Sequence, residues 1–196
     1  KSMITPADSF CDLIHIYIMD GRLVPSKSFS AEDLMKVKTN LKLEIHLMVE
    51  EPTKYLESFK RAGAKRIVFH YESKEEPSGV IEEIRALGLE AGIAINPETP
   101  VADVEKFFKD IDILLFLSVN PGFYGSKFLP EVCEKAKALK DRKDKPAIAM
   151  DGGIKADNIL LIRDSGVDIV CVGSGIYGKG DARQNYQELS RRSAGG

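Results

Sequence analysis

The sequence lacks several features that would place it in large classes of proteins. Its 196 residues carry 28 lysines and arginines against 30 aspartates and glutamates, a formal net charge of −2. Because there is no basic excess to neutralise a phosphate backbone, nucleic acid is not expected as a partner. No apolar run approaches the roughly 18 residues that a membrane helix needs, so a membrane is not expected either.

Cysteine is scarce and unpaired. Cys11, Cys133 and Cys171 form no CxxC pair and show no spacing typical of metal ligands. The first ten residues, KSMITPADSF, contain no apolar segment like that of a secretory leader. An odd number of cysteines without a leader favours reduced thiols, and we therefore expect a cytoplasmic protein.

Short apolar runs alternate with amphipathic segments along the whole chain. The runs, rich in Ile, Val, Leu and Ala, are Leu13–Met19, Leu43–Val49, Arg66–His70, Ala91–Ile95, Ile113–Val119, Ala147–Met150 and Ile169–Val172. Continuous apolar runs of this length are typical of parallel strands buried on both faces. The segments that we expect to be helical are Thr53–Ala62, Ser78–Leu87, Val101–Lys109, Pro130–Lys140 and Asp157–Asp164. Glycines such as Gly63, Gly88 and Gly166 follow several of them, as is common just past a helix.

Repeated βα units predict one α/β domain over residues 1–196, built as an open doubly wound sheet or as a closed barrel. Seven runs are one fewer than a (β/α)8 barrel needs. The shortfall lies at the front, where only about twelve residues precede the first run. Either Met3–Thr5 forms a remnant strand, or the first βα unit is missing or degenerate.

Histidines occur in consecutive runs at positions that suit an active site. The two-residue period of a strand places His15, Tyr17 and Met19 on one face, and His46 and Met48 on one face of the next run. Inward positions near the C-terminal ends of barrel strands point into the active-site mouth. A single strand histidine is more often a hydrogen-bonded core residue, and this remains the alternative.

A carboxylate adds to this pattern. Asp151 ends a later run, and the third histidine, His70, ends the third run. Two imidazoles, those of His15 and His46, and the carboxylate of Asp151 come from different strands and could hold a divalent metal with positions open for substrate.

Glycine clusters follow the last three runs: Gly122 and Gly125, then Gly152 and Gly153, then the Gly173-Ser174-Gly175 segment. Glycine lets backbone N–H groups approach an anion closely, and loops after the last barrel strands commonly bind phosphate. One Gly-Gly pair would indicate only a turn. Three clusters in successive loops predict a phosphate site.

Several segments together resemble ribulose-phosphate 3-epimerases. They run in order over residues 13–178 and read HIYIMDGRLVPS, EIHLMVEEPTKYLESFKRAGA, FHYES, AGIAINPETP, LSVNPGFYGSKFLP, MDGGIKADN and VGSGIYG. The resemblance implies a (β/α)8 TIM-type barrel that interconverts D-ribulose 5-phosphate and D-xylulose 5-phosphate in the pentose phosphate pathway. It also implies a divalent metal (zinc, iron(II) or manganese) and self-association into a homo-oligomer.

The resemblance also assigns roles to residues. It makes His15, His46 and Asp151 metal ligands, and Asp151 also one of two acid/base groups on opposite faces of the substrate. Met19 and His70 would support the site. Residues in contact with the substrate or its phosphate would be His46, Met48, Gly122, Gly125, Gly152, Gly153, Gly173 and Ser174.

The sequence departs from the family at Tyr17, where the family has an aspartate that is both a metal ligand and the second acid/base group. A tyrosine hydroxyl has an ordinary pKa of about 10 and is a poor base at neutral pH. We expect weakened metal binding and a rate lower by about 10²–10⁴. Asp20, Tyr17 or water would serve the second face; Asp20 with Gly21 could equally be only a turn.

Two other functions stay open. A catalytically impaired relative would bind a sugar phosphate without turnover, or would serve only as a scaffold for partners. A metal-free aldolase or isomerase would need a lysine at an inward strand end, which Lys65 does not provide.

Overall fold

The computed structural model describes residues 4–121 and 126–194, which belong to two compact units. The first unit spans Lys1–Ala94 and Asp110–Asp112, and the second spans Ile95–Lys109 and Ile113–Gly196. The expected single domain over residues 1–196 stays a prediction. No helix among the described residues has both the length and the apolar character needed to cross a membrane.

The first unit is built on parallel strands that pair in sequence order. They are β1 (Leu13–Met19), β2 (Lys42–Met48), β3 (Ala64–His70) and β4 (Glu90–Ile95). The register sets His15 opposite Glu44 and Tyr17 opposite His46. Because paired residues of parallel strands point to the same side of a sheet, the polar side chains of β1 and β2 share one face.

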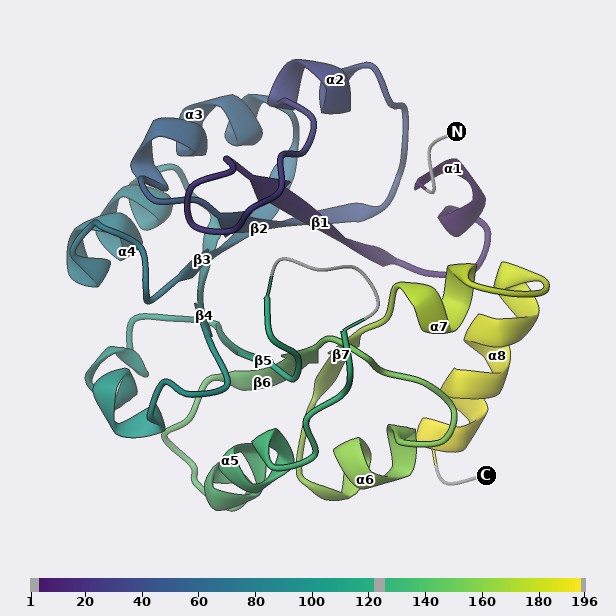
Figure 1. The fold of residues 1–196 in the computed structure, drawn as a ribbon. Helices are drawn as coiled ribbons and strands as arrows, with labels where there is room; N and C mark the ends of the chain where they lie inside the picture. The colour runs from purple at the N-terminus through teal and green to yellow at the C-terminus, as the bar shows by residue number, and fades with distance from the viewer. Residues whose placement is uncertain (1–3, 122–125, 195–196) are drawn as a thin grey trace. The chain divides into compact units, whose positions relative to one another are not determined.

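The other face of these strands is apolar and is covered by helices. Ile45 and Leu47 of β2 are fully buried and alternate with Glu44 and His46. Figure 1 shows α3 and α4 on one side of β2 and β3. The helices of the unit are α1 (Ile4–Ala7), α2 (Ala31–Met35), α3 (Thr53–Arg61) and α4 (Pro77–Ala86).

The helix ends agree with the sequence pattern. Gly63 and Gly88 follow α3 and α4 with φ of +93° and +69°, a backbone conformation that favours glycine. Ser30 begins α2 with a capping box, in which its side chain accepts from the N–H of Asp33 and the Asp33 side chain accepts from the N–H of Ser30.

A remnant strand at Met3–Thr5, one of the two alternatives for the N-terminal segment, is wrong for Ile4 and Thr5. Ile4 and Thr5 lie in the short helix α1, whereas Met3 lies outside the described residues. Pro6 suits this helix because the N–H groups of the first turn have no acceptor within the helix, so the N–H that proline lacks is not missed there.

The second unit contains β5 (Ile113–Leu117), β6 (Ala147–Asp151) and β7 (Ile169–Cys171), again parallel and paired in order. Its helices are α5 (Val132–Leu139), α6 (Ile159–Asp164), α7 (Ser174–Tyr177) and α8 (Ala182–Ser193). The segment expected to be a helix at Val101–Lys109 instead contains two 3₁₀ turns, η1 (Val101–Asp103) and η2 (Glu105–Phe107). Each of the seven apolar runs overlaps a strand.

Candidate functional site

Three histidines of the first unit form a continuous hydrogen-bonded row across β1, β2 and β3. His15 Nε2 lies 3.0 Å from His46 Nδ1, and His46 Nε2 lies 3.0 Å from His70 Nε2. The rings of His46 and His70 are stacked, with 5.0 Å between centroids. The in-register pairing of neighbouring strands therefore brings together the three residues that the sequence predicted.

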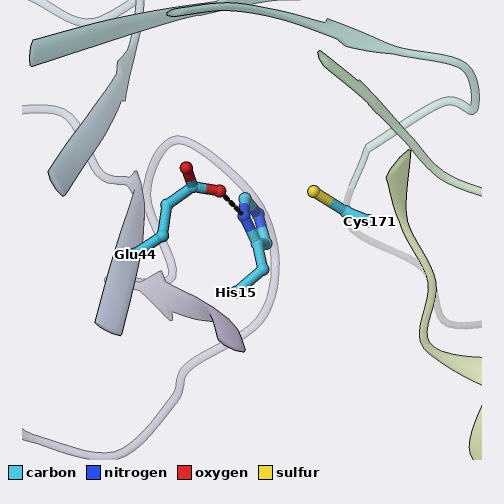
Figure 2. Close-up of side chains that lie close together, drawn as sticks. All are labelled: His15, Glu44 and Cys171. Atoms are coloured by element: carbon cyan, nitrogen blue, oxygen red, sulfur yellow. Dashed lines mark hydrogen bonds and ion pairs between the residues drawn. The ribbon is translucent and has the colours of Figure 1, made fainter. Parts of the chain in front are cut away.

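A buried carboxylate holds the first ring of the row. His15 Nδ1 donates to Glu44 Oε1 across 2.6 Å, as Figure 2 shows. Glu44 is fully buried, and its other oxygen accepts from Arg66 Nη1 at 2.7 Å. Burial would raise the pKa of Glu44, but the hydrogen bonds from His15 and Arg66 outweigh it, and the pKa lies below its ordinary value. Glu44 is therefore an anion that anchors His15.

A second carboxylate ends the row at the other side. His70 Nδ1 donates to Glu72 Oε2 across 3.0 Å. His46, between the two outer rings, is fully buried. Burial and the neighbouring rings of His70 and His15 hold the pKa of His46 well below its usual range, so His46 is neutral at pH 7.

Tyr17 lies beside the row. Its ring contacts His15 edge-on, with 4.9 Å between centroids, and lies 5.8 Å from the His46 ring. Met48, two residues after His46, is buried, and Met19 is half-buried. The side chains of His15, Tyr17 and His46 therefore share one face, as strand periodicity predicts, and the place of Met19 and Met48 on that face stays a prediction.

Asp20 forms a turn. Its Oδ1 accepts from the backbone N–H groups of Arg22 and Leu23 at 2.8 and 3.1 Å, and its Oδ2 accepts from that of Glu50 at 2.9 Å. Gly21 follows with φ of +77°. Burial would raise the pKa of Asp20, but the three backbone donors outweigh it and the pKa is lowered. A carboxylate held in this way ties the end of β1 to the end of β2.

In the second unit, Asp151 ends β6 with 5% of its surface exposed. The hydroxyl of Ser118 donates to the carbonyl oxygens of Asp151 and Gly152, which fixes the backbone at this strand end. Gly152 has φ of +115°, and a Cβ there would meet Val119 at 2.6 Å. Asp151 is thus held at the C-terminal end of its strand by a loop in which both the backbone conformation and the close approach of Val119 require glycine at position 152.

Of the remaining predicted phosphate contacts, Gly153 follows Gly152 with φ of +65°, and the others lie in one later and one earlier loop. Gly173 precedes α7, where a Cβ would meet no described atom within 4 Å, and Ser174 is the first residue of α7. Gly122 and Gly125 lie outside the described residues. The loop after β7 is therefore open at Gly173.

Sequence reasoning missed three charged residues of the site. Glu44 and Glu72 accept hydrogen bonds from the outer histidines His15 and His70, and Arg66 donates a hydrogen bond to Glu44. One signal was present: Glu44 lies inside an apolar run and Arg66 begins the next one, and a charge in a buried strand needs a partner. Glu72 follows its strand and shows no such signal.

The histidine row fits a divalent metal ion of the transition series. Imidazole nitrogen suits zinc and iron, and His15 Nε2 and His46 Nδ1 face each other from adjacent strands. A histidine that binds a metal commonly donates its other ring N–H to a carboxylate, as His15 does to Glu44.

These features define a parallel α/β protein with a histidine cluster on one sheet face and a buried aspartate at a strand end. Residues 3–177 match the sequence profile of the Ribulose-phosphate 3 epimerase family, and the chain belongs to this family. It is 36% identical over 185 residues to "Ribulose-phosphate 3-epimerase" of Bacillus subtilis, covering 91% of this chain and 85% of that protein. It is 37% identical over 184 residues to the protein of the same name from Aquifex aeolicus, covering 91% and 83%.

Solved structures agree on the fold. "Phosphoribosyl anthranilate isomerase from Thermococcus kodakaraensis" is similar with a TM-score of 0.68 at 16% sequence identity, covering 100% of this chain and 96% of that one. At this identity the likeness shows the fold alone. The predicted fold class, α/β of the (β/α)8 TIM-type, and the predicted family of epimerases are both confirmed.

Proposed function

We propose that this chain epimerises C3 of a ketopentose 5-phosphate, converting D-ribulose 5-phosphate to D-xylulose 5-phosphate through an enediolate. The proposal rests on the facing imidazoles of His15 and His46 in a member of the epimerase family. His15 Nε2 and His46 Nδ1 lie 3.0 Å apart. The names of the relatives, which match most of the chain, support the same substrate.

Proton transfer is assigned to Asp151, which lies at the C-terminal end of β6, the end of the strands at which barrel enzymes place their active sites. His15, His46 and Asp151 would hold zinc, iron(II) or manganese. A bound divalent ion supplies positive charge that stabilises the oxygen anion formed when the proton next to a ketone leaves.

Substrate binding is assigned to the residues that the resemblance to the family indicates. Met48 and Met19 would pack on the carbon chain from the face that carries His46. Backbone N–H groups around Gly152, Gly153, Gly173 and Ser174 would bind the phosphate, together with Gly122 and Gly125. Self-association into a homo-oligomer and a cytoplasmic location stay predictions.

Whether the chain is an active enzyme or an impaired one depends on a second group that transfers a proton, on the face of the substrate opposite Asp151. Epimerisation needs a group on each face of the substrate, and Tyr17 stands where the family has an aspartate. Asp20 is a poor candidate because three backbone N–H groups occupy its oxygens. Tyr17 or a water molecule would then serve the second face, and turnover would be slow.

The impaired relative is therefore the second candidate function, favoured by the position of the Tyr17 ring against His15. Such a protein would bind the sugar phosphate without turning it over. An aldolase that forms a Schiff base is disfavoured, because Lys42 and Lys65 lie at the beginnings of β2 and β3 and are exposed.

Formation of D-xylulose 5-phosphate, measured with zinc, iron(II) or manganese added in turn, tests the proposal. We expect wild type to be slow and Tyr17→Asp to be faster by about 10²–10⁴. Tyr17→Phe is the matched control, since it keeps the ring and removes the hydroxyl; it should stay slow. High and equal rates in wild type and Tyr17→Asp would contradict the role given to position 17.

Thermal unfolding separates the two candidate functions. Millimolar D-ribulose 5-phosphate should raise the melting temperature if the anion site binds it, because a ligand of the native state stabilises that state. A raised melting temperature without turnover in wild type or Tyr17→Asp would favour the impaired relative. No shift and no turnover would refute both.

A further inference from the structure

Ser118, the residue that follows β5, binds two successive backbone carbonyls at the end of β6. Its N–H and its hydroxyl both donate to the carbonyl oxygen of Asp151, at 2.8 and 3.0 Å. The hydroxyl also donates to the carbonyl oxygen of Gly152, at 2.7 Å. Because the N–H already holds Asp151 and the contact with Gly152 is the shorter one, the main acceptor of the hydroxyl is Gly152. Ser118 is fully buried, so bulk water does not compete for these contacts.

The backbone that carries this hydroxyl is itself fixed. The carbonyl oxygen of Ser118 accepts a hydrogen bond from the N–H of Leu129 at 2.8 Å. The preceding residue, Leu117, pairs in register with Asp151 in the sheet. The hydroxyl therefore stands at a set position beside the end of β6.

The peptide that the hydroxyl holds joins two glycines. Gly152 and Gly153 have φ of +115° and +65°, conformations that residues with side chains rarely adopt. A peptide between two glycines meets few steric limits on rotation about the neighbouring bonds, so it could turn over and point its N–H the other way. The hydrogen bond from Ser118 to its carbonyl oxygen removes that freedom.

This hydrogen bond sets the direction of one N–H group. The C=O and the N–H of a trans peptide point in opposite directions. Because the carbonyl of Gly152 is turned toward Ser118, the N–H of Gly153 points away from it. No described residue accepts a hydrogen bond from this N–H. Gly153 therefore offers one donor in a fixed direction.

The peptide on the other side of Gly153 is held by a different residue. The carbonyl oxygen of Gly153 accepts from Asn158 Nδ2 at 3.0 Å, and Asn158 Oδ1 accepts from the N–H of Lys155 at 2.8 Å. The backbone of Phe128 lies so close that a Cβ at Gly153 would meet it at 3.0 Å. Of these contacts, only that of Ser118 acts on the peptide that carries the Gly153 N–H.

We infer that Ser118 is a positioning residue, whose hydroxyl holds the Gly152–Gly153 peptide so that the N–H of Gly153 faces the phosphate of the sugar. A donor held in this way needs no rearrangement when the oxyanion binds, and binding is tighter for it. Ser118 contacts no substrate atom in this role. The inference deepens the proposed function, because it rests on Gly153 being a phosphate contact in that function.

The test is the dissociation constant of D-ribulose 5-phosphate, measured by calorimetric titration of the full chain. Ser118→Ala keeps the backbone bond to Asp151 and loses the hydroxyl, so the peptide can turn over. Loss of one hydrogen bond of ordinary net strength lowers the share of the competent orientation, and the dissociation constant should rise about 5–10-fold.

Ser165→Ala is the matched control. The hydroxyl of Ser165 is also buried and also donates to a backbone carbonyl oxygen, that of Ile162 in α6, at 2.6 Å. It makes no printed contact with the glycines of the β6 loop, and this variant should bind D-ribulose 5-phosphate like wild type.

A second pair of variants isolates the hydroxyl. Ser118→Thr and Ser118→Val introduce side chains of nearly the same shape, and only the first keeps a hydroxyl. Because both carry the cost of added volume, Ser118→Thr should bind D-ribulose 5-phosphate about 5–10-fold more tightly than Ser118→Val. A merely structural role would lower the melting temperature of Ser118→Val relative to Ser118→Thr and leave the two dissociation constants equal.

Nuclear magnetic resonance of the wild-type chain tests the N–H itself and needs no variant to fold. Inorganic phosphate added to nitrogen-15-labelled protein should shift the amide resonance of Gly153. The amide of Gly79, in α4, should not move. In Ser118→Ala the shift of Gly153 should require about 5–10-fold more phosphate.

The outcomes separate the inference from the proposed function. Equal dissociation constants in wild type and Ser118→Ala, or a Gly153 amide that phosphate leaves unchanged, overturn the inference even if the chain epimerises. The expected losses of affinity with no D-xylulose 5-phosphate formed by wild type or Tyr17→Asp support the inference and reject epimerisation. Wild type that binds neither inorganic phosphate nor D-ribulose 5-phosphate overturns both.

Discussion

Replacement of Asp20 distinguishes a turn residue from a proton carrier. Its two oxygens have different partners: Oδ1 accepts from Arg22 and Leu23, and Oδ2 accepts from Glu50. Asp20→Ala removes all three hydrogen bonds. In Asp20→Asn one oxygen can still accept from Arg22 and Leu23, while the new NH₂ group faces the N–H of Glu50, donor against donor.

The expected size of each effect follows from these contacts. A net value of about 1 kcal/mol for each hydrogen bond gives a loss of about 3 kcal/mol for Asp20→Ala. Asp20→Asn loses the bond to Glu50 and should cost about 1–2 kcal/mol. For a chain of this length 1 kcal/mol corresponds to about 2–4 °C, so the melting temperature should fall by about 6–12 °C and 2–8 °C.

The dependence on pH has a definite sign. The pKa of Asp20 is lower in the folded chain than its ordinary value. The unfolded chain therefore takes up the proton first as the pH falls, and the contribution of Asp20 to stability is complete above about pH 4–5 and is lost below it. The difference in unfolding free energy between wild type and Asp20→Asn should shrink in urea unfolding as the pH is lowered from 7 toward 3.

A measurement of turnover could contradict the assignment of Asp20 as a turn residue. Measured in a Tyr17→Asp background, Asp20→Asn should lower turnover by much less than the 10²-fold expected for loss of a proton carrier. A loss of 10²-fold or more at unchanged stability would show that Asp20 moves protons, and the assignment of a turn would be wrong.

Two further substitutions, the first with a matched control, test a close backbone contact and a buried ion pair. Gly152→Ala should lower the unfolding free energy, measured by calorimetry, by about 2–3 kcal/mol, because φ is +115° and the new Cβ would meet Val119 at 2.6 Å. Gly79→Ala is the control: this residue lies in α4 with open space around it, and the substitution should raise the unfolding free energy by about 0.5–1 kcal/mol. Arg66→Met should lower the unfolding free energy, measured in urea, by about 3 kcal/mol, because it leaves the fully buried Glu44 without its cation. A decrease below about 1 kcal/mol would mean that Glu44 is not ionised.

Much of the fold could be predicted from local patterns. Runs of apolar residues such as Ile113–Leu117 indicated parallel strands, and the glycines after α3 and α4 indicated helix ends. Both signals lie within a few neighbouring residues, so the sequence carries them in full. The segment at Val101–Lys109 shows the limit of local patterns. Its amphipathic pattern predicts a helix, but the chain there forms two 3₁₀ turns instead.

By itself the sequence determined the family and the face that carries His15, Tyr17 and His46, because a strand repeats every two residues whatever surrounds it. Only the tertiary structure decided what lies opposite each of them. The register of β1 on β2 sets His15 against Glu44, and the register of β2 on β3 sets Glu44 against Arg66. Register depends on how whole strands and their buried faces pack together, and no local stretch of sequence contains that information.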